Sequence, residues 1–107
     1  MSGSGGSGGG GYVPPVRARF SCETGQIISK VASVDLGVLA KHKVGNVLDL
    51  EVHSGILMLY DGDGELLGSI IHPNVLELIQ CIDQDFEYEA EITIINIPSC
   101  TVKIKRK

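Results

Sequence analysis

The stretch EYEAEI at residues 87–92 and the stretch VKIKRK at residues 102–107 decide the fold of this chain. Glutamates alternate with Tyr, Ala and Ile in the first stretch, and lysines alternate with Val, Ile and Arg in the second. A period of two is typical of β-strands, because successive side chains point to opposite faces. Since Ile97-Pro98-Ser99 lies between the two stretches, the pattern predicts an antiparallel hairpin with one buried face and one solvent-facing side.

Two registers of this hairpin place the apolar side chains of both strands on one face and the charged side chains on the other. Glu91 lies opposite Lys103 in one and opposite Lys105 in the other. In both registers the basic tail faces the hairpin's own glutamates. Pairing with these glutamates therefore accounts for the lysines at the end of the chain, and nucleic-acid binding is not needed to explain them.

The chain divides into a short low-complexity segment and one domain. Residues 1–11 contain only Met, Ser and Gly, and we interpret them as a flexible linker. Residues 12–107 are long enough for a single compact β-rich domain with one modest core. The net charge of −4 argues against a protein whose main task is to grip phosphate backbones.

The cysteines and the hydropathy pattern predict a cytoplasmic location. The chain has three cysteines, an odd number, and none of them has CxxC spacing. We therefore expect reduced thiols at Cys22, Cys81 and Cys100. No apolar run is long enough to span a bilayer, and no secretory signal is present, so we expect no membrane contact.

The rest of the chain predicts further strands and two helices. Alternation over residues 16–20 and β-branched residues over 27–34 indicate two strands. Asp35 is a candidate cap for a short helix of about two turns, with Lys41-His42-Lys43 placed to offset its dipole. A three-stranded meander then turns at Ser54-Gly55, and a second helix begins at His72-Pro73. The fold class is mainly β (α+β), a small antiparallel β-barrel or sheet of about six strands with two helices.

One turn of the meander resembles the opening of a calcium-binding loop. Asp61, Asp63 and Glu65 have the right spacing, but Leu66 and His72 stand where such a loop needs Gly and a bidentate Glu. We therefore expect a hairpin turn with solvated carboxylates.

No motif predicts catalysis, a cofactor or a metal site. The three histidines and three cysteines lack the short spacings of zinc sites, and no glycine-rich phosphate loop is present. Cys81 and Cys100 fit the pattern of small core residues. The sequence thus favours a protein that is not an enzyme.

Two sets of residues are candidates for recognition. Ile56, Met58 and Tyr60, together with Leu67, alternate with the predicted core residues of the meander. This second apolar face is either covered by the helix after Pro73 or exposed as a protein-binding patch. The alternative set would bind nucleic acid. It consists of Arg17, Arg19 and Lys30, with Tyr12 or Phe20 as stacking groups.

The run VGNVLDL at residues 44–50 and the run DGELLGSI at residues 63–70, followed by a helix, resemble the HIRAN domain over about residues 44–95. The resemblance implies a small β-barrel with helices and, as in some members, binding of single-stranded DNA ends. Residues 51–57 do not carry the Asn-Pro-x-Asp-x-x-Ala segment usual in that family. No functional residue is therefore carried across.

Together these patterns predict a non-catalytic interaction module of a larger protein or complex, which binds a protein partner. The alternative is a HIRAN-like module that binds single-stranded DNA ends. The residues do not define an oligomeric state.

Overall fold

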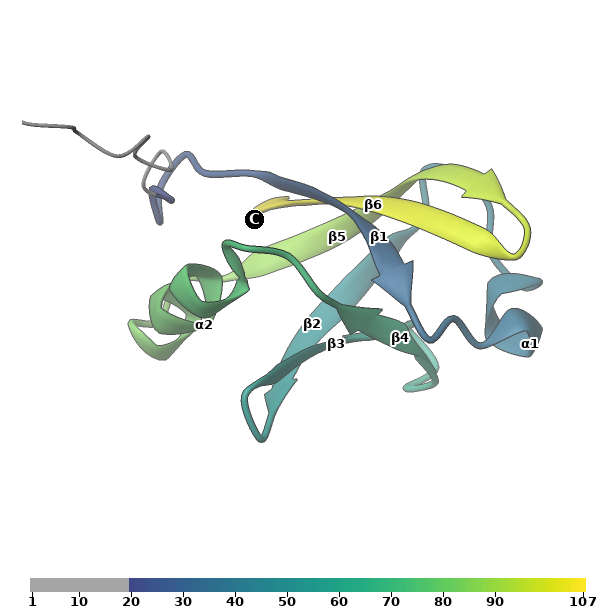
Figure 1. Cartoon of the computed structure of the whole chain (residues 1–107), viewed down its shortest axis with the longest axis horizontal. Helices are drawn as coiled ribbons and strands as arrows, with labels where there is room; N and C mark the ends of the chain where they lie inside the picture. Colours follow the sequence, from purple (N-terminus) through teal and green to yellow (C-terminus); the bar gives the residue numbers. More distant parts are fainter. Residues whose placement is uncertain (1–19) are drawn as a thin grey trace, which may run out of the picture.

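The computed structural model of this 107-residue chain describes residues 20–107, and in them six strands close into an antiparallel barrel (Figure 1). The strand order around the barrel is β1-β4-β3-β2-β5-β6. The predicted class, a small and mainly β barrel with two helices, is confirmed. In chain order the elements are β1 (Ile27–Ala32), α1 (Leu36–Leu39), β2 (Val47–His53), β3 (Ile56–Tyr60), β4 (Leu66–Ile70), α2 (Val75–Asp83), β5 (Tyr88–Asn96) and β6 (Ser99–Arg106).

The β5–β6 hairpin adopts the first of the two predicted registers. Glu91 lies opposite Lys103, and Glu89 lies opposite Lys105. The Nζ atom of Lys105 also donates to Oε1 of Glu91, at 3.1 Å. Ala90 and Ile92 of β5 and Val102 and Ile104 of β6 are fully buried, so the period of two separates the core from the charged face along this part of the hairpin.

The β2–β3 hairpin turns at Ser54 and Gly55, as predicted. Both residues have positive φ, 51° and 78°, which a two-residue hairpin turn requires. This turn sets Val52 opposite Leu57, and the two leucines of β3 that face inward are completely buried.

The prediction for Leu67 is wrong. Strict alternation predicts that Leu67 lies on the outer face of the meander, but its side chain is completely buried. The register of β3 with β4 shifts between Leu59 and Tyr60, where Leu66 and Gly68 pair with successive residues of β3. The extra residue in this bulge reverses the parity of the alternation, and Leu67 therefore points into the barrel.

The first helix has the predicted cap but is shorter than expected. Oδ1 of Asp35 accepts a hydrogen bond from the Val38 N–H at 3.1 Å, and the helix spans only Leu36–Leu39. Its last turn contains no basic residue, so the predicted dipole role of residues 41–43 is wrong. The strand predicted over residues 16–20 lies outside the described residues except for Phe20, which is not in a strand.

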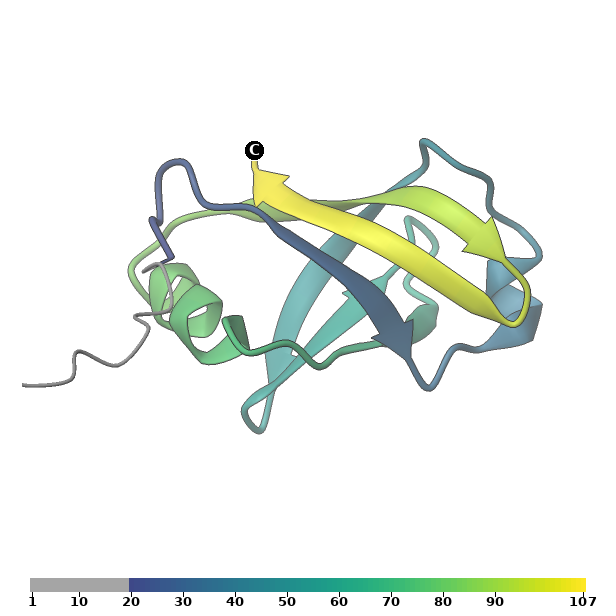
Figure 2. The same cartoon turned by 45° about the horizontal axis from the view of Figure 1, so that its top comes forward.

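The second helix lies at one end of the barrel and α1 at the other (Figures 1 and 2). Val75, Leu78 and Cys81 of α2 are buried in the core cluster, whereas Leu76 is 70% exposed. A closed barrel leaves its interior open only at the ends, and the apolar stripe of α2 fills one of them. The interpretation that this helix covers the outer face of β3 is therefore wrong.

Two of the three cysteines form a disulfide. Cys22 and Cys81 are 59 residues apart in sequence and are joined in the folded chain. The expectation that all three thiols are reduced is thus wrong for this pair, because folding brings together partners that sequence spacing does not connect. Cys100 is free and buried, and burial raises the pKa of its thiol.

Candidate functional site

The outer face of β3 carries Ile56, Met58 and Tyr60, the residues singled out as a recognition patch. Alternation along the strand turns them outward, because Leu57 and Leu59 fill the barrel. Ile56 is 47% exposed, and Met58 and Tyr60 are partly exposed. An apolar stretch of β3 therefore reaches the surface of the molecule.

Two adjoining depressions lie on this outer face, with volumes of about 220 and 330 Å³. Both include Ile56 and Ser69 in their walls, and we call the two adjoining depressions together the β3–β4 groove. Two further apolar side chains in its walls are well exposed, Leu66 at 42% and Ile71 at 78%. The residues lining the groove are Ser33, Gly55, Ile56, Met58, Leu66, Gly68, Ser69, Ile70, Ile71, His72 and Val75.

Tyr60 lies at the border of the groove and does not line it. Its hydroxyl donates to Sδ of Met58 at 3.7 Å, and the ring of His53 meets its ring edge-on at 6.0 Å between centroids. Nε2 of His53 in turn lies 2.9 Å from Oε1 of Glu51. These contacts hold the tyrosine ring between the apolar groove and a polar strip on β2.

That polar strip gives the groove an acidic border. The β2–β3 register sets Asp49 opposite Tyr60 and Glu51 opposite Met58. Both carboxylates belong to exposed residues. The site thus combines an apolar floor with negative charge along one side.

Of the residues of the nucleic-acid alternative, only Lys30 and Phe20 lie within the described part of the chain. Lys30 is exposed on β1, opposite Thr101 of β6. Phe20 packs against Tyr88 with ring centroids 6.0 Å apart, so it is not a free stacking platform. Arg17, Arg19 and Tyr12 lie outside the described residues.

A polar cluster at the α1 end of the barrel centres on Asp61, whose carboxylate is only 1% exposed. The prediction of solvated carboxylates in this turn is therefore wrong for Asp61. Its Oδ1 accepts the N–H groups of Asp63 and Glu65 at 2.9 Å each, and its Oδ2 lies 3.0 Å from Nε2 of His42. Lys41 completes the cluster with ion pairs to Glu65 and Asp61.

This cluster holds the segment after α1 against the β3–β4 turn. It explains two of the three basic residues of the Lys41-His42-Lys43 run, since Lys41 and His42 both contact Asp61. An aspartate that accepts the N–H two residues ahead is a common turn device, and this is the signal that could have predicted the arrangement.

We expect the Asp61 cluster to make stability depend on acid pH. The Glu65 N–H, followed by the His42 side chain, lowers the pKa of Asp61 below its ordinary value of 3.8. A lowered folded-state pKa contributes stability that is present above the unfolded pKa and is lost as pH falls through the folded pKa. The variant Asp61→Asn should thus lose stability at neutral pH and show a flatter decline below about pH 4.

Urea unfolding at a series of pH values measures this dependence. Asp63→Asn is the matched control, because Asp63 is exposed in the same turn and its carboxylate makes none of these contacts. Equal pH profiles for the two variants would contradict the role assigned to Asp61.

No metal-binding cluster is formed within residues 20–107, where no three His, Cys, Asp or Glu side chains are placed to hold an ion. In the same residues, neither helix is long and apolar enough to cross a membrane.

Comparison with known proteins supports the fold class. No protein-family model matches the chain, and no curated protein is similar to it in sequence. The fold is similar to that in the crystal structure of a protein from Lactobacillus plantarum, with a TM-score of 0.67 and 15% sequence identity. The match covers 78% of this chain and 96% of that chain. At this identity the likeness shows the fold alone.

Proposed function

We propose that this domain is a non-catalytic interaction module that binds a protein partner through the β3–β4 groove. The observation that carries the proposal is the exposure of Ile56, Leu66 and Ile71 around the two adjoining depressions of the groove. Isolated apolar side chains are common on protein surfaces, whereas contiguous ones mark contact sites. Met58 adds a flexible side chain that can adapt to a partner.

The charge around the groove defines the chemistry of the partner. Asp49 and Glu51 border the apolar floor, and the whole chain carries a net charge of −4. A complementary segment would present apolar side chains next to Lys or Arg. Such charge complementarity speeds association and selects among apolar partners.

A displayed library of random peptides tests this proposal. We expect selection on the oxidised, full-length chain to enrich peptides in which apolar residues neighbour Lys or Arg. Fluorescence anisotropy of an enriched peptide should then show binding weakened about tenfold or more by Ile56→Asp, because a charge in the groove removes a central apolar contact.

The matched control is Ile94→Asp. Ile94 is 55% exposed, similar to Ile56, but lies on β5 and does not line the groove. Thermal melts of both variants check that each remains folded. Enriched peptides that bind the two variants equally well would refute the groove as the contact site.

Binding to single-stranded DNA is the alternative that the HIRAN resemblance raises. Anisotropy of labelled DNA with a free 3′ end, at two salt concentrations, distinguishes it from peptide binding. Binding that weakens steeply with salt, and that is lost on changing Arg17, Arg19 and Lys30 to Ala, would replace the protein-binding proposal.

A further inference from the structure

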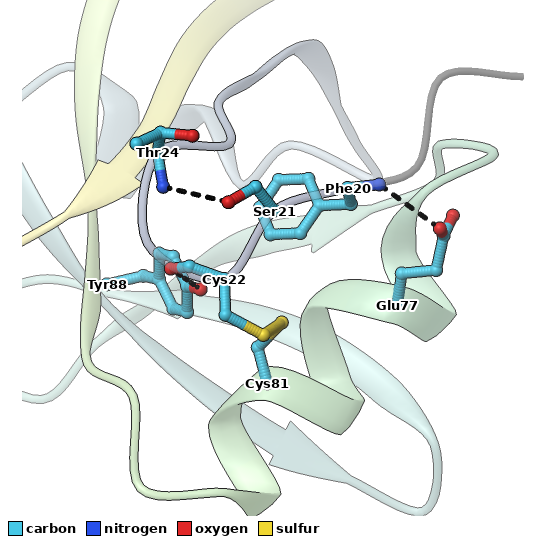
Figure 3. The surroundings of a disulfide bond; sticks show 7 residues. All are labelled: Phe20, Ser21, Cys22, Thr24, Glu77, Cys81 and Tyr88. Atoms are coloured by element: carbon cyan, nitrogen blue, oxygen red, sulfur yellow. Dashed lines mark hydrogen bonds between the residues drawn. A yellow bond between two sulfur atoms is a disulfide. The ribbon is translucent and has the colours of Figure 1, made fainter.

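The segment from residue 20 to residue 26 contains no helix or strand and is fastened to the α2 end of the barrel (Figure 3). The disulfide joins Cys22 of this segment to Cys81 of α2. The Tyr88 hydroxyl donates to the Cys22 carbonyl at 2.5 Å, and the Phe20 N–H donates to Oε2 of Glu77 at 3.3 Å. We propose that this disulfide is a redox-sensitive clasp, whose reduction releases residues 20–26 from α2 while the barrel stays folded.

The disulfide-bonded cysteines border a cavity. A cavity of about 270 Å³ has both cysteines in its wall. Cys22 is only partly buried, whereas Cys81 is 3% exposed. Because Cys22 is the more exposed residue of the pair, we expect an incoming thiolate to attack its sulfur.

The barrel does not depend on the clasped segment for its strand pairing. β1 begins at Ile27, and its first partner on β6 is Ile104. Within the segment, only Phe20 and Cys22 pack against the core, and both are partly buried. Other hydrogen bonds, such as the one from the Gly25 N–H to the Ser21 carbonyl, are local to the segment. The covalent bond is thus its strongest attachment.

Opening the clasp requires a dithiol as co-reactant. One thiolate of the dithiol attacks Sγ of Cys22, and the S–S bond breaks to release Cys81 as a thiolate, which takes up a proton. The second thiol of the reductant then attacks the mixed disulfide and releases the thiol of Cys22. Two electrons pass to the protein, and the dithiol becomes a cyclic disulfide.

The clasp determines where the polypeptide leaves the barrel. In the oxidised chain Phe20 is held at α2, whereas after reduction the ordered body begins at Ile27. The released residues add up to about 23 Å of reach, at about 3.3 Å per residue. The predicted cytoplasmic location would favour the open clasp, and an oxidising compartment would favour the closed one.

Hydrogen exchange followed by mass spectrometry on the full chain tests the clasp, with dithiothreitol as the reductant. After reduction, verified by alkylation of the thiols, we expect amides of residues 20–26 to exchange at least tenfold faster. Those of β1 to β6 should keep most of their protection. The variant Cys22→Ser should show the same pattern without reductant, and Cys100→Ala should respond to dithiothreitol as the unmodified chain does.

Two results would overturn the proposal. Unchanged exchange of residues 20–26 after complete reduction would mean that non-covalent contacts suffice to hold the segment. Loss of protection throughout the strands, in both the reduced chain and Cys22→Ser, would mean that the disulfide supports the whole barrel and not a clasp.

Discussion

Reducing the Cys22–Cys81 disulfide is expected to lower the free energy of unfolding by about 2–4 kcal/mol. The bond closes a loop between cysteines that are 59 residues apart, and loop-closure entropy for that length gives about 4 kcal/mol. The freed segment regains some conformational entropy in the folded state, which reduces the loss. Domains are typically stable by about 5–15 kcal/mol, so we expect the reduced barrel to remain folded.

Urea titrations of the oxidised and reduced chain measure this difference. Cys22→Ser should match the reduced chain and should not respond further to reductant, because the remaining pair of cysteines is not joined. A loss below about 1 kcal/mol, which is far less than the loop-closure estimate, would contradict the stabilising role of the disulfide.

Replacing Leu78 by Ala is expected to cost about 2–5 kcal/mol of stability. Leu78 is completely buried and belongs to the stripe of α2 that fills one end of the barrel. Truncation removes its apolar contacts and leaves a cavity among side chains that are fixed by the closed sheet. The surrounding core can therefore relax only in part.

Leu76→Ala is the matched control, since it makes the same chemical change on the same helix. Leu76 is 70% exposed, so its truncation should change stability by no more than about 0.5 kcal/mol. Chemical denaturation of both variants gives the comparison. Similar values for the two would show that α2 does not seal the barrel.

The alternation of side chains along β3 predicts only part of the candidate site. Alternation along β3 sets Ile56, Met58 and Tyr60 opposite to the core leucines, and the structure has them on the outer face. Whether that face is covered depends on where α2 packs. This helix is joined to β4 by residues 71–74, and alternation along β3 does not predict its position. Leu66 and Ile71 were not predicted as parts of the site, because they join the groove only through the register of β3 with β4.

The sequence by itself determined the features that depend on neighbouring residues. It predicted the β5–β6 hairpin with two possible registers, the turn at Ser54-Gly55 and the cap at Asp35, since strand parity, turn geometry and capping arise within a few residues. The structure selected the register in which Glu91 lies opposite Lys103. Only the tertiary structure decided where α2 lies, which cysteines pair and how deeply Asp61 is buried. Each of these depends on closure of the barrel. Closure brings together segments that are distant in sequence and separates a buried interior from a solvent-facing surface.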